Sequence, residues 1–267
     1  IKNPTVSGSA GTYDIETQNS SSVKIDEGTV SSNTITVGAL TSSSITHASL
    51  VAGAISNTTI AFTAANPVAA GGKIKVIFPS GFDITGAAYV SGNSGATVSI
   101  NLQALTLTTG TLVTSGSSPS IVISGIKNPT VSGSAGTYDI ETQNSSSVKI
   151  DTGTGSSNTI TAGALTSPAI THASLVAGAI SNTTIAFTAA NPVAVGGKLK
   201  VTFASGFDIS LAAYSSGNLG TTSAVSGQAL TLTLGAAITA GSSPSIVISG
   251  IKNPTVSGSA GTYDIET

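Results

Sequence analysis

Residues Ile1–Thr17 read IKNPTVSGSAGTYDIET, and the same stretch returns unchanged at Ile126–Thr142 and at Ile251–Thr267. Residues 1–125 and 126–250 therefore align end to end without a gap. Within the stretch, apolar Tyr13 and Ile15 alternate with acidic neighbours, which is the pattern of a half-buried β-strand. The chain is thus a tandem array of one β-rich repeat, and a repeat of this kind is typical of a protein built to be long.

The rest of the repeat continues the strand pattern. In Lys73–Phe78 (KIKVIF) the apolar residues occupy every second position, and no segment shows helical periodicity. We count about eight short strands per repeat, each bounded by Gly, Ser, Asn or Pro, as expected of an all-β sandwich. The predicted core residues of the two repeats are Ile74, Val76, Phe78 and Phe82, and Leu199, Val201, Phe203 and Phe207.

The phase of the repeat decides the domain boundaries. Residues 38–44 (GALTSSS) are small and polar, and we interpret them as a linker. Pro168 in the matching stretch of the second copy also suits a linker better than the interior of a strand. We therefore expect sandwich domains at 39–163 and 164–267, with residues 1–38 as the terminal strands of a preceding repeat or as a donor segment.

The composition excludes several function classes. Charged residues make up only 7% of the 267 residues, cysteine is absent, and the net charge is −2. The absence of cysteine excludes a disulfide framework and thiolate metal sites. The sequence also has no cluster of Lys or Arg residues of the kind that binds nucleic acid. No apolar stretch is long enough to span a bilayer, and no signal peptide is visible. Because the chain starts at Ile and holds no Met, we expect a processed product or an excerpt of a longer protein.

Three runs carry a resemblance to a known kind of protein: NPVAAGGKIKVIFPSGFDI (66–84), SPSIVISGIKNPT (118–130) and GTYDIET (136–142). Together they resemble the tandem immunoglobulin-like repeat of large microbial cell-surface and extracellular fibre proteins. The resemblance covers nearly the whole chain. It implies tandem immunoglobulin-like β-sandwich domains strung together as a stalk, an adhesin or a matrix fibre at the cell surface.

Acidic side chains are densest in the first copy of YDIET and the stretch after it, and the second copy largely repeats this group. If the expected phase holds, they lie near a domain junction, where Ca²⁺ bound through oxygen ligands could stiffen a fibre. No calcium-binding loop motif is present, so the alternative is that these are solvated strand faces. The candidate calcium ligands are Asp14, Glu16, Asp26, Glu27, Asp139, Glu141 and Asp151.

No residue set points to catalysis. Each repeat has one histidine, His47 or His172, in an ITHASL stretch without a second histidine nearby. We interpret these as exposed or edge side chains, since a lone strand histidine is seldom a metal ligand. A nucleophile elbow or a phosphate-binding loop needs a following helix, and none is predicted. We therefore expect no enzyme and no cofactor besides calcium.

The leading hypothesis is a structural subunit of an extracellular filament or cell-surface fibre that self-assembles head to tail through β-strand pairing. The alternative is an adhesin that binds glycan or a partner surface protein. The copies differ most at 94–102 against 219–227, and neither stretch carries the aromatic or Arg residues expected of a binding loop. The chain itself is the expected partner, and four N-x-S/T sequons leave glycan modification open.

The assembly prediction concerns residues 1–38. Unpaired strand edges are adhesive and are normally covered. We expect this segment to pack against a neighbouring subunit, or to continue from a preceding repeat, and to complete a sheet by strand addition. Because 251–267 already duplicates 1–17, the donor role rests on residues 18–38. The residues predicted to mediate assembly are Val23, Ile25, Ile35 and Val37.

Overall fold

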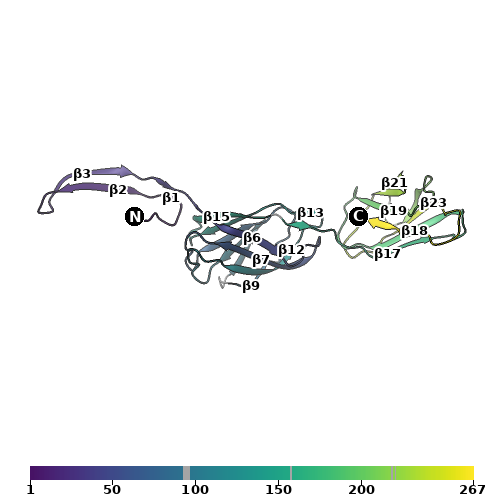
Figure 1. The fold of residues 1–267 in the computed structure, drawn as a ribbon, viewed down its shortest axis with the longest axis horizontal. Helices are drawn as coiled ribbons and strands as arrows, with labels where there is room; N and C mark the ends of the chain where they lie inside the picture. Colours follow the sequence, from purple (N-terminus) through teal and green to yellow (C-terminus); the bar gives the residue numbers. More distant parts are fainter. Residues whose placement is uncertain (93–96, 157, 218, 220) are drawn as a thin grey trace. The chain divides into compact units, whose positions relative to one another are not determined.

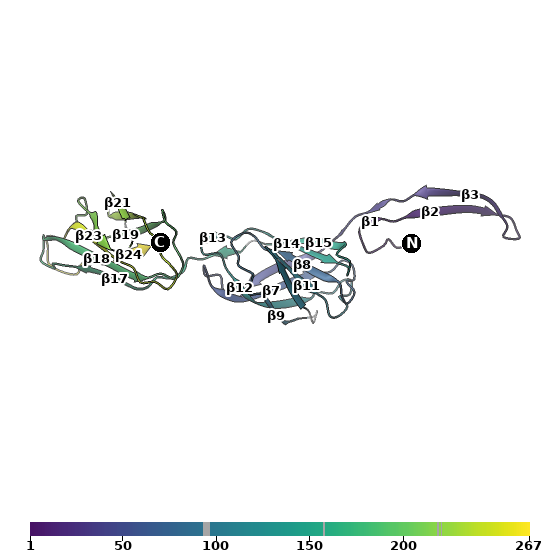
Figure 2. The same ribbon diagram turned by 180° about the vertical axis from the view of Figure 1, so that it is seen from behind.

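The computed structural model describes residues 1–92, 97–156, 158–217, 219 and 221–267. These residues form strands and contain no helix, so the predicted all-β fold class is confirmed. The chain divides into two compact units, Ile1–Thr161 and Ala162–Thr267 (Figures 1 and 2). The finer division at residues 38 and 163 stays a prediction. A search of the described residues for a helix that could cross a membrane finds none.

Unit 1 contains a sandwich of two main sheets. Its larger sheet holds, in spatial order, β10 (Thr97–Asn101), β11 (Ala104–Thr108), β8 (Lys73–Ile77), β14 (Tyr138–Gln143), β15 (Lys149–Gly155) and β5 (Gly38–Ala39). Its smaller sheet holds β6 (Thr41–His47), β7 (Ile55–Thr63), β12 (Ser120–Lys127) and β9 (Ala88–Ser91). A short ladder joins β13 (Gly133–Ser134) to β16 (Thr159–Ile160). Among the described strands of unit 1 the pairing of β15 with β5 is parallel and the others are antiparallel, and the isolated bridge between Val51 and Thr161 is parallel as well.

Apolar alternation builds the core of unit 1 between these sheets. Ile74, Val76 and Phe78 are buried, and the lysines between them are only half-buried. Phe82 is also buried, and its ring packs edge-on against that of Phe78 at a centroid distance of 5.7 Å. The predicted core residues of the first repeat are thus confirmed.

The N-terminal segment repeats the local pairing of the second copy. Strand β2 (Thr12–Gln18) pairs with β3 (Lys24–Ser31), as β14 pairs with β15, and β1 (Gly8–Ser9) pairs with β4 (Thr34–Ile35), as β13 pairs with β16. The β2–β3 hairpin is a two-stranded sheet of its own (purple in Figure 1), and every residue in it is exposed. Nearly identical sequence, which differs in the hairpin only at Glu27/Thr152 and Val30/Gly155, therefore forms the same hairpin in two different environments.

Unit 2 is a sandwich of two four-stranded sheets. One contains β17 (Thr166–His172), β18 (Ile180–Thr188), β23 (Ser245–Lys252) and β20 (Ala213–Gly217). The other contains β21 (Thr221–Ser226), β22 (Ala229–Leu234), β19 (Lys198–Thr202) and β24 (Asp264–Glu266). The predicted core residues Leu199, Val201, Phe203 and Phe207 are buried here. Strand β24 takes the position that β14 has in unit 1, and among the described residues no strand follows it at that sheet edge.

The predicted linker at 38–44 is wrong. Residues 38–39 form β5, and β6 begins at Thr41. Small polar residues fit here because β6 is an edge strand whose inward positions, Ile45 and His47, alone are buried. Pro168 likewise lies inside β17, where the register shifts between Thr166 and Ala169. A proline without an N–H donor is tolerated at such a bulge on an edge strand.

Candidate assembly site

The four residues predicted to mediate assembly all lie in the exposed N-terminal segment. Val23, Ile25 and Val37 are exposed, and Ile35 is half-buried in β4. In the second copy the counterparts of Ile25 and Ile35, Ile150 and Ile160, are buried, whereas those of Val23 and Val37, Val148 and Ala162, are exposed. The role of the four residues in assembly stays a prediction.

The apolar face of the hairpin is exposed in the first copy and buried in the second. Tyr13 and Ile15 are 54% and 59% exposed, whereas Tyr138 and Ile140 are fully buried in the core of unit 1. Ile25 is 62% exposed, whereas its counterpart Ile150 is 3% exposed. The sequence of the hairpin is therefore suited to cover an open sandwich, and in the first copy it covers none.

Strand β15 shows how the hairpin completes a sandwich. Asp151 is fully buried, and its carboxylate accepts hydrogen bonds from the backbone N and the Nδ2 of Asn66, at 3.0 and 2.7 Å. Beside it, the N–H of Leu40 donates to the carbonyl of Thr152. These bonds fix β15 to both β5 and the loop after β7.

The residues after β15 then seal one end of unit 1. Ile160 enters the core and is 2% exposed. Asn158 Nδ2 donates to the Tyr138 hydroxyl and to the Ile45 carbonyl, both at 3.2 Å. The N–H of Thr161 donates to Leu50, and its carbonyl accepts from Ala52, both at 2.8 Å. This plug, Asn158–Thr161, thus joins the 50–52 loop to the end of both sheets.

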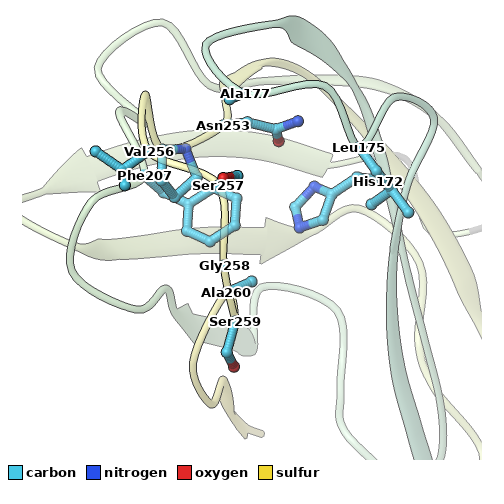
Figure 3. A pocket seen from close by; sticks show the side chains of 11 residues that line it. His172, Leu175, Ala177, Phe207, Asn253, Val256, Ser257, Gly258, Ser259 and Ala260 are labelled. Carbon is cyan, nitrogen blue, oxygen red and sulfur yellow. The ribbon is translucent and has the colours of Figure 1, made fainter.

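In unit 2 the matching place is an open groove of about 220 Å³. Figure 3 shows the loop from Val256 to Ala260 on one side of it and His172 and Leu175 on the other. Leu175 is 85% exposed and Ala177 is exposed, whereas their counterparts Leu50 and Ala52 are 37% and 5% exposed. Asn253 holds the wall in place, because its Nδ2 donates to the carbonyls of Ser174 and Val176.

A histidine lies at the floor of each site and links its two sheets. His172 Nδ1 and Nε2 are 2.8 and 2.9 Å from the hydroxyls of Thr183 and Tyr263, and its ring stacks on Phe207 at 4.9 Å. His47 makes the same contacts in unit 1. Burial lowers the pKa of His47 to about 4, and it lowers the pKa of His172 as well.

The expectation of an exposed or edge histidine is correct for His47 in its edge position and wrong in its exposure. It lies on edge strand β6 but is buried, because its ring is stacked and both ring nitrogens have hydroxyl partners. Nδ1 bonds to Thr58 on the neighbouring strand β7, and Nε2 bonds to Tyr138 in the other sheet. We interpret the network as a polar connection inside the sandwich.

The predicted calcium ligands are distributed over two hairpins. Lys24 lies within ion-pair distance of Glu16 and Glu27, and Lys149 pairs with Glu141 at 2.8 Å. Asp26 accepts from the Thr17 hydroxyl, Asp151 is bound to Asn66, and Asp14 and Asp139 are exposed on β2 and β14. Over the described ranges, no three acidic or histidine side chains gather closely enough to hold a metal ion. The calcium site stays a prediction.

The groove residues Leu175, Ala177, Val256 and Ala260 were not predicted from the sequence. Their small and aliphatic side chains occur throughout the chain, so composition does not distinguish them. The repeat register contains the only signal: residues 158–161 read NTIT and have an identical counterpart at 33–36. The sequence alone does not show that residues 158–161 close one end of the sandwich, because this depends on the burial of Ile160.

Neither a scan against models of protein families nor a search of curated proteins finds a match. Among solved structures, the chain is similar to one reported for manganese lipoxygenase of Gaeumannomyces graminis with a partial zonadhesin of Komagataella pastoris, at 12% identity and a TM-score of 0.29, covering 80% of this chain and 84% of that one.

Two further solved structures show a similar degree of likeness. A B domain of a biofilm-associated protein has 8% identity and a TM-score of 0.29, with coverage of 82% of this chain and 75% of that one. A Corynebacterium diphtheriae protein described as membrane-anchored has 8% identity and a TM-score of 0.24, with 95% and 88% coverage. At this level of similarity the three structures carry no argument about function.

Proposed function

We propose that the chain is a structural subunit of an extracellular filament or cell-surface fibre and assembles head to tail through β-strand pairing. The observation that carries the proposal is the contrast between two copies of one hairpin. The copy at 126–163 buries its apolar face in a sandwich, while the copy at 1–38 exposes the same face. The exposed face of the first copy therefore has the same apolar residues that the second copy uses to cover a sandwich.

Head-to-tail pairing of two different surfaces is heterologous. Such a contact extends into an open filament unless the rotation between subunits closes a ring. The low content of charged and aromatic side chains supports a structural role, because binding surfaces rely on aromatic and Arg anchors. The immunoglobulin-like character of the sandwiches and the extracellular location are part of this proposal.

The alternative function is an adhesin that binds glycan or a partner surface protein. The stretches where the copies differ most, 94–102 and 219–227, contain neither aromatic residues nor Arg, which favours the structural role. Residues 94–96 and 220 of these stretches lie outside the described part of the chain. The remaining residues contribute mainly to β10 and β21, which pair within their own sheets.

Negative-stain electron microscopy of the purified chain tests the proposal directly. We expect filaments whose number rises with protein concentration. Particles that stay single at every concentration, together with binding to a glycan array, would replace the structural role with the adhesive one.

A further inference from the structure

We propose that two segments of the unit 1 sandwich, residues 38–52 and 151–161, form a mechanical clamp that resists tension along the chain. The inference goes beyond the proposed function and does not depend on it, because it concerns the response of one folded unit to force. It rests on the direction of the two segments and on the bonds between them, all of which lie inside unit 1.

The two segments run side by side in the same direction. Strand β5 pairs in parallel with β15, and Gly38 lies opposite Asp151. Further along both segments, Val51 forms a parallel bridge with Thr161. Because β5 is an edge strand of the larger sheet and β6 is an edge strand of the smaller one, the first segment passes from one sheet to the other alongside the second segment.

The two parallel contacts lie at opposite ends of the sandwich. Strand β7 runs from Ile55 to Thr63 and serves as a reference. Gly38 lies next to the side chain of Asn66, just after the end of β7, whereas Val51 lies shortly before its beginning. The pair of segments therefore spans the length of this strand.

Hydrogen bonds join the segments at both contacts and between them. The donors and acceptors are Leu40 N–H with the Thr152 carbonyl at 2.8 Å, Asn158 Nδ2 with the Ile45 carbonyl at 3.2 Å, Thr161 N–H with the Leu50 carbonyl at 2.8 Å, and Ala52 N–H with the Thr161 carbonyl at 2.8 Å.

Close packing accompanies these bonds. A Cβ built on Gly155 would lie 3.1 Å from Cγ1 of Ile45, and one built on Gly153 would lie 2.8 Å from Cβ of Leu40. Leu40 and Ile45 are both buried. The backbone of β15 thus passes close to the first segment, and sliding one segment along the other would disrupt a dense contact as well as the hydrogen bonds.

The geometry determines how tension acts on the clamp. Tension along the chain reaches the clamp through Val37, before the first segment, and through Ala162, after the second. Since the segments are parallel and these two points lie at opposite ends, tension pulls the segments past each other, and all the bonds between them carry the force together. Forced unfolding is governed by the rate of leaving the native state, so bonds that must break together in that step slow it.

Pulling on the chain in two directions tests the clamp. The chain contains no cysteine, so pairs of cysteines introduced at exposed residues give defined attachment points for optical tweezers. Val37→Cys with Ala164→Cys loads the two segments in shear. Val37→Cys with Ser146→Cys, in the turn before β15, peels them apart from one end.

At equal force we expect unfolding to be at least about tenfold slower in shear than in peeling, since several net hydrogen bonds must be lost at once. Unfolding in shear that is as fast as in peeling, or faster, would overturn the proposal. This comparison leaves every residue of the clamp unaltered, so it decides the proposal even where a clamp variant does not fold.

Asn158→Ala tests one of the bonds directly. It removes the donor to the Ile45 carbonyl, and Asn33→Ala, in the identical NTIT sequence outside the loaded segments, is the matched control. In shear, Asn158→Ala should unfold about fivefold faster than the parent, which is the effect of one net hydrogen bond on a rate, and Asn33→Ala should not differ. In peeling, where the contact at Gly38 opens first, Asn158→Ala should have a smaller effect. Equal acceleration in both directions would assign the effect to general stability and overturn the clamp.

The outcomes are independent of those that test the proposed function, because single molecules are pulled. Filaments formed by a chain that unfolds equally fast in both directions leave the structural role standing and overturn the clamp. Slower unfolding in shear of a chain that forms no filaments supports the clamp and overturns the structural role.

Discussion

At the scale of single residues, each sandwich depends on a small number of rings. Phe78, Phe82 and Tyr138 lie within 6 Å of one another by ring centroid, and His47 stacks on Phe82. Aromatics make up only 4% of the chain. Because the remaining core of unit 1, apart from Phe62, is Ile, Leu, Val and Ala, loss of one ring leaves a cavity that small neighbours cannot fill.

Phe78→Ala should therefore destabilise unit 1 by about 3–5 kcal/mol, the usual range for truncating a buried Phe. Urea denaturation followed by tyrosine fluorescence measures the change. Leu112→Ala at an exposed position is the control and should change the free energy of unfolding by less than about 0.5 kcal/mol. A loss below 1 kcal/mol for Phe78→Ala would show that the ring is exposed and that the register of β8 is shifted by one residue.

His47 should make unit 1 sensitive to mild acid. Its pKa is lowered from 6.5 to about 4 by burial, so folding disfavours the protonated ring. The stabilisation is fully present above pH 6.5 and is lost as the pH falls toward 4, by up to about 3 kcal/mol from the size of the shift. His172, which is less buried, should cause a smaller loss in unit 2.

Urea titrations between pH 7.5 and pH 4 check this expectation against His47→Gln. Glutamine keeps a polar side chain but does not titrate, so the variant should lose less stability over this range. Equal pH dependence of the parent and the variant would assign the effect to carboxylates such as Glu141, whose pKa is also perturbed.

At the scale of the element, one sequence forms the same hairpin with different surroundings. Strand β15 is held on one side by β14 and on the other by β5, whereas β3 pairs with β2 alone. Hairpin geometry is set by local sequence and register, but an isolated two-stranded sheet is marginal in water. The contribution of the sandwich to the stability of the hairpin can therefore be measured by removing the hydrogen bonds that Asp151 of β15 makes.

Asp151→Ala and Asp26→Ala form a matched pair for that measurement. Removal of the Asp151 carboxylate leaves the buried donors of Asn66 without their acceptor and should cost about 2–4 kcal/mol. Asp26 has the same place in an exposed hairpin, so its replacement should change the free energy of unfolding by less than about 0.5 kcal/mol. Equal effects in urea titrations would contradict the different environments of the two hairpins.

At the scale of the whole molecule, the two units have separate cores. The buried apolar side chains form one cluster from Leu40 to Ile160 and a second from Ile185 to Ile251. Unit 1 is completed by β15, β5 and the plug, while the matching edge and groove of unit 2 are open. Unit 2 should consequently be the less stable of the two.

Differential scanning calorimetry should show two transitions, the lower one from unit 2. Phe78→Ala should move only the upper transition, and Phe203→Ala, its counterpart, only the lower one, because each ring lies in one core. A single cooperative transition would mean that the two units unfold together.

The sequence by itself determined the strand content, the repeat and most of the core. Period-2 alternation in KIKVIF reports which residues face inward, and a 125-residue repeat means that both copies must fold alike. The local sequence pattern wrongly predicted a linker at 38–44 and at Pro168, where the structure has strands. Small polar residues and proline are tolerated on an edge strand with a bulge, and only the sheet order shows which strands are edges.

The existence of the groove in unit 2 follows from the tertiary structure alone and could not be predicted from the sequence. Residues 33–36 and 158–161 are identical, so no local property distinguishes an exposed plug from an inserted one. The burial of His47 and the placement of Ile160 depend on contacts between residues far apart in the chain, such as His47 with Tyr138. Pairing within a hairpin such as β14–β15 is local and can be read from period and turn, whereas the surface that the hairpin covers depends on strands far away in the chain, such as β8.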